Sequence, residues 1–165
     1  MEIESKNMQV YNLIANEFSD KRYSNWDWIE QFKNSFFNNS MILDIGCGNG
    51  RNMMNKHLKF IGIDNCHNFI KICKEKSLHV LECDMVNIPL PESTFDGIMS
   101  IASFHHLSND ERRNQALMEM KRMLKDGGKI LLSVWSINQR HNPKLSFTYG
   151  DNLVPWKNND GTIKE

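Results

Sequence analysis

The apolar positions of this chain follow two different spacings. Near the N-terminus they recur every three or four residues over 10–18 and 28–36, which is typical of two amphipathic helices. From residue 41 onward, short apolar runs alternate with helical segments. The runs predict five strands, at 41–45, 59–63, 78–83, 95–101 and 129–135. Such alternation indicates an α/β fold with a doubly wound, mainly parallel sheet and helices on both faces, which binds ligands at the carboxyl ends of its strands.

Helices are expected between these strands, the first two at 51–57 and 67–76. A capping box opens a longer helix, because Ser108 precedes Glu111 by three positions. We expect this helix to end at the glycine pair 127–128. Its expected buried residues are Ala116, Leu117, Met120 and Leu124.

The composition changes after residue 136. Residues 1–136 form the predicted core domain, which includes the N-terminal helices within 6–37. Residues 137–165 are mostly polar and are interrupted by proline and glycine, so we expect an irregular tail on the substrate side.

The first predicted strand runs into a glycine-rich loop, Asp44-Ile45-Gly46-Cys47-Gly48-Asn49-Gly50. Glycines at alternate positions allow a sharp turn and a close approach of the backbone to a ligand. A dinucleotide site would favour G-x-G-x-x-G. The spacing G-x-G-x-G after a strand-end acid favours S-adenosylmethionine, whose ammonium group the Asp44 carboxylate would meet. A tight turn without a ligand is the alternative.

Two further acids end neighbouring strands. Asp64 follows the second strand, where a carboxylate can accept hydrogen bonds from both ribose hydroxyls. Asp84 follows the third, placed to accept the adenine amino group. Together with the loop, these acids predict S-adenosylmethionine binding. The expected cofactor contacts are Asp44, Gly46, Cys47, Gly48, Asp64, Asn65, Asp84, Met85, Ile101 and Ala102.

Composition excludes several other classes of protein. The chain has 165 residues with 20 basic and 20 acidic side chains, so it lacks the overall positive charge typical of non-specific nucleic-acid binding. Its four cysteines form no C-x-x-C pair, so we expect neither a zinc site nor a disulfide framework, which fits the reducing cytoplasm or nucleus. We expect no signal peptide and no membrane association, because the start is acidic and no apolar stretch approaches ~20 residues.

Two histidines follow the fourth strand, where a substrate would meet the transferred methyl group. His105 or His106 can serve as a base, an orienting donor or an anion contact, with His106 the preferred candidate. The alternative is that one caps the next helix and the other fills a gap against the sheet.

These features resemble class I methyltransferases, which share the glycine loop and the acids at Asp44, Asp64 and Asp84. A narrower resemblance, covering most of residues 8–157, is to the eukaryotic tRNA wobble-uridine carboxymethyl methyltransferases. It rests on Val10-Tyr11-Asn12-Leu13-Ile14-Ala15 with Phe18-Ser19, Arg22-Tyr23 with Trp26, Ser100-Ile101-Ala102 with His105-His106, Glu111-Arg112-Arg113, and Val134-Trp135 with Val154-Pro155-Trp156. The resemblance implies methylation of the carboxylate of 5-carboxymethyluridine in tRNA. It also implies a small zinc-binding activator subunit that pairs with an edge strand.

The resemblance assigns roles to further residues. A carboxylate is ionised at neutral pH, so it needs no base but must be held by cationic or hydrogen-bonding groups. Arg22 is the candidate clamp, and Tyr23 and Trp26 offer a stacking surface for a flipped-out base. The alternative is that both aromatic residues only attach a hinge to the core. Arg112 and Arg113 are expected to contact phosphate or to be structural.

The chain departs from the family in two places. Family members continue with two further strands after the Val-Pro-Trp stretch, so we expect the tail to be incomplete, and Asn25 stands where proline is usual. Two other functions stay open on this evidence. One is a small-molecule methyltransferase on the same fold, and the other is a non-catalytic, cofactor-binding homologue.

Overall fold

The computed structural model describes residues 2–21, 26–138, 147–150, 152, 154, 156–157 and 163–164. The chain divides into two compact units, 1–134 and 135–165. The first unit contains a parallel five-stranded sheet in the order β3-β2-β1-β4-β5. Its strands are β1 Met41–Ile45, β2 Lys59–Asp64, β3 Val80–Glu82, β4 Phe95–Ile101 and β5 Leu124–Ser133. The predicted doubly wound fold is therefore confirmed, and β3 is an edge strand.

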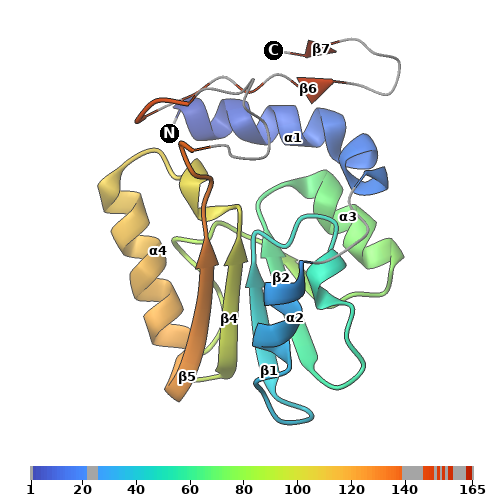
Figure 1. Ribbon diagram of the computed structural model, residues 1–165, viewed down its shortest axis with the longest axis vertical. Coiled ribbons are helices and arrows are strands. Elements are labelled where there is room, and N and C mark those ends of the chain that lie inside the picture. The colour runs from blue at the N-terminus through green and yellow to red at the C-terminus, as the bar shows by residue number, and fades with distance from the viewer. Residues whose placement is uncertain are drawn as a thin grey trace. The chain divides into compact units, whose positions relative to one another are not determined.

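Helices cover both faces of this sheet, and one helix lies across its carboxyl edge. Figure 1 shows α4 and α2 on different sides of the strands and α1 over the strand tips. The α-helices are α1 Glu2–Asp20, α2 Asp27–Lys33, α3 His67–Glu75 and α4 Asp110–Met123, with 3₁₀ turns η1 Arg51–Met53 and η2 Phe104–His106.

Alternate residues of β1 separate the two halves of the core, because successive strand side chains point to opposite faces. Leu43 and Ile45 pack in the cluster that contains Met120 of α4. Ile42 packs in the cluster that contains Ile29 of α2. Asp44 shares the parity of Ile42, so its side chain lies on the face covered by α2.

The capping-box prediction is wrong by one residue. The N-cap of α4 is Asn109, whose Oδ1 accepts a hydrogen bond from the Arg112 amide at 2.9 Å. The predicted end at the glycine pair is also wrong, because Leu124 leaves the helix to pair with Phe95 in the sheet. Leu117, expected in the core, is 43% exposed.

Two other predicted elements are shorter than expected. The predicted helix 51–57 is only the turn η1, because the Asn55 side chain accepts hydrogen bonds from the amides of His57 and Leu58 and starts a new turn. The third strand begins at Val80, since the Leu78 amide is still bonded to the carbonyl of Cys73 in α3.

The second unit is described by itself. Its short strands β6 Trp156–Lys157 and β7 Ile163–Lys164 pair antiparallel. The rings of Trp135 and Phe147 stack, with centroids 5.8 Å apart. Within the described part of the chain, no helix is both long and apolar enough to cross a membrane.

Candidate cofactor-binding site

The glycine loop turns through three left-handed residues that have different surroundings. Gly46, Gly48 and Gly50 have φ of 70°, 53° and 75°. A Cβ on Gly46 would lie 2.3 Å from Cβ of Ser103, so this residue lets the loop pack against the end of β4. A Cβ on Gly48 would have no neighbour within 4 Å. The loop therefore packs against the protein at Gly46. At Gly48 it borders open space, where a ligand would approach.

Asp44 is fully buried directly before this loop. Neither of its carboxylate oxygens has a hydrogen-bond partner among the described residues. Burial, together with the neighbouring Asp64, raises the pKa of Asp44 to about 7. Lys33, Arg51 and the Asn52 side chain oppose this rise without cancelling it. Because buried polar groups are normally paired, this carboxylate is suited to a cationic ligand such as an ammonium group.

Lys33 is a buried charge near the site that the sequence analysis missed. Only 1% of the residue is exposed, and Nζ lies 2.6 Å from the Glu30 carboxylate and 3.2 Å from the Asn52 carbonyl that it donates to. The lysine therefore joins α2 to the turn that follows the glycine loop. Lys33 follows the apolar Ile29 by four residues, so the helical spacing alone places both on the buried face of α2.

Asp64 holds the loop as well as facing the site. Its Oδ2 accepts from the Gly48 amide and its Oδ1 from the Cys66 amide, both at 2.9 Å. Burial raises the pKa of Asp64, although amides including those of Cys66 and Gly48 lower it in part. A carboxylate oxygen has two lone pairs, so each retains the capacity to accept one ribose hydroxyl.

Asp84, in contrast, already has protein partners. Its Oδ2 lies 2.6 Å from Nη2 of Arg112, and its Oδ1 accepts from the Val86 amide at 3.2 Å. The same guanidinium is 2.8 Å from the Glu4 carboxylate of α1. Arg112 therefore has a structural role here, and an adenine amino group at Asp84 would have to share the carboxylate with it.

The histidine pair is neutral and held by α1. Nε2 of His106 lies 3.0 Å from the Tyr11 hydroxyl, and the two histidine rings are 4.3 Å apart. Burial lowers the pKa of both, that of His105 to about 4 with a further contribution from His106. At neutral pH they can orient a substrate by hydrogen bonding but provide no positive charge.

Helix α1 contacts the segments that follow β1, β2 and β4, and it reaches the segment after β3 through Arg112. Beyond Glu4 and Tyr11, its Asn12 accepts from the Asn68 amide at 3.1 Å, and Ser19 accepts from the Asn49 side chain at 3.2 Å. Local sequence patterns do not predict these asparagine and serine contacts. Because α1 bonds to Asn49 after β1 and to Cys66 and Asn68 after β2, and reaches Asp84 through Arg112, it forms one wall of the candidate site.

The remaining predicted site residues differ in burial, and two of them are not described by the structure. Cys47 and Ile101 are buried, and Ala102, with φ of 52°, donates its amide to the Ser133 carbonyl. Met85 is half-buried against the core and Asn65 is exposed. Arg22 and Tyr23 lie outside the described residues.

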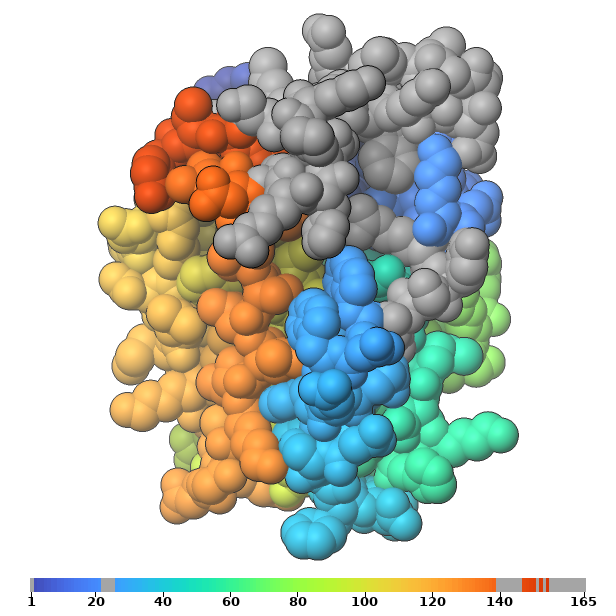
Figure 2. All heavy atoms as spheres, in the orientation of Figure 1, coloured from blue at the N-terminus to red at the C-terminus, as the bar shows by residue number. Residues whose placement is uncertain are grey.

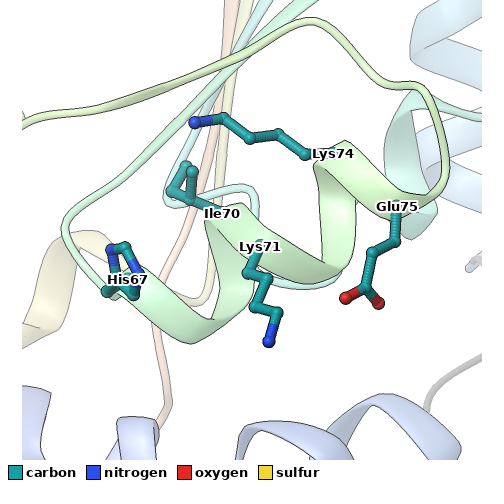
Figure 3. Close-up of a pocket in the computed structure, with 5 residues that line it drawn as sticks. All are labelled: His67, Ile70, Lys71, Lys74 and Glu75. Atoms are coloured by element: carbon teal, nitrogen blue, oxygen red, sulfur yellow. The ribbon is translucent and has the colours of Figure 1, made fainter.

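A separate hollow lies on α3. Figure 3 shows its lining residues, His67, Ile70, Lys71, Lys74 and Glu75. None of them belongs to the predicted site, and His67 is paired with Glu82 at 2.8 Å. This hollow is a surface feature of one helix.

Known proteins share both the fold and the sequence. Residues 43–132 match the family described as "Methyltransferase domain". The tRNA (carboxymethyluridine(34)-5-O)-methyltransferase of Schizosaccharomyces pombe is 41% identical over 94% of this chain and 71% of its own length. Those of Arabidopsis thaliana and Mus musculus are 42% and 39% identical over 88% and 93% of this chain. The chain spans only 36% and 24% of these two relatives.

Solved structures agree with the fold. A SAM-dependent methyltransferase from Aquifex aeolicus matches with a TM-score of 0.58 and 25% identity, over 70% of this chain and 67% of that one. A putative methyltransferase from Haloferax volcanii, solved with the Trm112 methyltransferase activator, matches with a TM-score of 0.62 and 19% identity, over 75% and 59%.

Fold and site together define a class I, S-adenosylmethionine-dependent methyltransferase domain. Within that class, the chain belongs to the family of tRNA (carboxymethyluridine(34)-5-O)-methyltransferases, and the predicted family resemblance is confirmed.

Proposed function

We propose that this protein transfers the methyl group of S-adenosylmethionine to the carboxylate of 5-carboxymethyluridine at the wobble position of tRNA. The proposal rests on buried Asp44 beside the open side of the glycine loop, since its carboxylate has no hydrogen-bond partner in the described part of the chain and suits the cofactor's ammonium group. The substrate is inferred from the activity for which the relatives are named.

The chemistry agrees with the neutral histidine pair. Sulfonium methyl transfer is an in-line displacement, so alignment and exclusion of water matter most. The attacking carboxylate is already ionised and needs no general base. His106, held by Tyr11, would orient the substrate, and the charge that holds the carboxylate would come from Arg22.

The test is methyl transfer from labelled cofactor to tRNA that lacks the wobble methyl ester. Arg22→Ala should lower turnover about thirtyfold to a thousandfold, and Arg22→Lys should recover little, because a point charge cannot replace a planar two-pronged contact. Lys21→Ala, the neighbouring basic residue, is the control and should stay within about twofold. Labelling of small molecules but not of tRNA would contradict the proposed substrate. Cofactor binding without transfer to either would indicate a non-catalytic homologue.

A small zinc-binding activator subunit belongs to the same proposal. The edge strand β3 carries Leu81, which is 37% exposed, and an uncovered apolar edge favours aggregation. The Haloferax neighbour was solved with the Trm112 methyltransferase activator. We expect the isolated chain to be poorly soluble and co-expression with the activator to rescue it. A monomeric, soluble and fully active isolated chain would contradict this.

The cellular compartment is part of the proposal too. All four cysteines are free thiols, which is compatible with the reducing environment of the cytoplasm or nucleus. Fractionation of cells that express a tagged protein tests this assignment.

A further inference from the structure

Two tryptophans stack at the start of α2. The Trp26 and Trp28 rings lie 5.5 Å apart between centroids and are inclined by only 12°. The guanidinium carbon of Arg51 lies 4.6 Å from the centroid of the Trp26 ring. Arg51 directly follows Gly50, so this aromatic stack adjoins the glycine loop. Figure 2 shows the segment that contains α2 at the surface of the face in view.

Core packing does not explain this aromatic stack. Trp26 and Trp28 are 43% and 39% exposed, whereas the neighbouring Ile29 is fully buried and anchors the helix. Residues two apart in a helix do not normally face each other. Here Trp26 is the N-cap with extended backbone, φ −82° and ψ 145°, which allows its ring to lie against Trp28. Two large rings thus stay partly in water beside the candidate site.

We propose that Trp28, backed by Trp26 and Arg51, is a stacking platform for an unpaired nucleobase of the RNA substrate, next to the nucleotide that is methylated. This inference rests on the proposed tRNA methyltransferase function. Flat aromatic faces with a guanidinium are the surface on which unpaired bases stack, and such stacking tolerates any base.

The local charges favour contact with a base rather than with a phosphate. The acidic residues on α2 are Asp27 and Glu30, and Glu30 is paired with Lys33 at 2.6 Å. Arg51 is positioned over a ring, where it reinforces stacking. The platform therefore adds affinity by stacking on an uncharged nucleobase, while S-adenosylmethionine bound at the neighbouring glycine loop would supply the methyl group.

The experiment compares Trp28→Ala, Trp28→Phe and Phe37→Ala. Phe37 is a matched control, because it is 90% exposed and follows the same helix. The probe is an anticodon stem-loop RNA with 5-carboxymethyluridine, used with the full chain and its activator. Trp28→Ala should raise the KM for this RNA about fivefold to a hundredfold. Trp28→Phe should keep most of the affinity, and Phe37→Ala should change nothing. The Kd for cofactor should stay within twofold in all three.

The outcomes separate this inference from the proposed function. An unchanged KM in folded Trp28→Ala would overturn the platform, while methylation by the parent would leave the function intact. Loss of activator binding in Trp28→Ala with normal RNA affinity would show a protein-binding surface instead, and would also overturn it. No RNA methylation by the parent protein would contradict the function itself.

Discussion

Asp44 near the end of β1 and Asp84 just after β3 lie at the same edge of the sheet, and their surroundings differ sharply. Asp44 is completely buried and has no hydrogen-bond partner among the described residues. Asp84 has a side chain 39% exposed, paired with Arg112 at 2.6 Å and with the Val86 amide. The ionised Asp44 carboxylate lowers the stability of the cofactor-free protein, whereas the paired Asp84 carboxylate raises it.

This difference indicates that Asp44 serves cofactor binding, whereas Asp84 serves the stability of the fold. A buried carboxylate without a partner destabilises the protein unless a cation arrives, so Asp44 is explained by its ligand. A carboxylate that joins α4 and α1 through Arg112 is explained by the fold, whether or not it also contacts adenine. Burial and pairing thus distinguish two acids that look equivalent as strand-end residues.

The largest expected effect is that of Asp44→Asn. Without the charge, cofactor binding should weaken a hundredfold or more, because a buried ion pair loses one partner at a cost of about 3–5 kcal/mol. The empty variant should be more stable than the parent at pH 8 by about 2–4 kcal/mol, since ionising Asp44, with its pKa raised to about 7, is costly. Calorimetric titration and urea unfolding measure the two quantities.

Asp84→Asn is the matched control for Asp44→Asn in both the calorimetric titration and the urea unfolding. It should slightly destabilise the empty chain, by about 1 kcal/mol or less for so exposed a pair, and weaken cofactor binding no more than about tenfold. Similar effects of the two substitutions would remove the distinction between the acids.

A smaller effect is expected at the glycine loop. Gly46→Ala should destabilise the chain by about 3 kcal/mol, because its Cβ would lie 2.3 Å from Cβ of Ser103 and the backbone is left-handed. Gly48→Ala shares the backbone strain without the clash and should cost about 1 kcal/mol. Gly48→Val should instead block the cofactor. Urea unfolding of the three variants checks the order, and equal losses for the two alanine variants would contradict the geometry.

The smallest effect on cofactor binding is expected for Glu4→Gln in α1. Glu4 accepts the Ser108 amide and pairs with Arg112. Burial opposes ionisation, but these partners hold its pKa below the ordinary value. The substitution should cost about 1 kcal/mol of stability and speed hydrogen exchange in α1, with the cofactor Kd within threefold. A tenfold weaker Kd would instead make the α1 contact part of cofactor binding.

Local patterns predicted most of the fold but few of the contacts in the site. The β1 and β4 boundaries were correct because apolar runs and turns are short-range signals. The Glu4–Arg112 pair joins residues 108 apart, and the Tyr11–His106 contact joins residues 95 apart, so no local spacing reveals them. The start of α4 was missed because Ser108 and Asn109 are both good N-caps, and only packing selects between them.

The role of Asp44 is tested most directly by the proton released when S-adenosylmethionine binds. Calorimetry at pH 6 in two buffers of different ionisation enthalpy measures this release. Asp44, with a pKa of about 7 in the empty protein, is mostly protonated at pH 6 and must ionise to hold the cofactor's ammonium. We predict release of about one proton per cofactor in the parent and almost none in Asp44→Asn, titrated at higher concentration. A binding enthalpy independent of the buffer in the parent at pH 6 would contradict the assignment of Asp44.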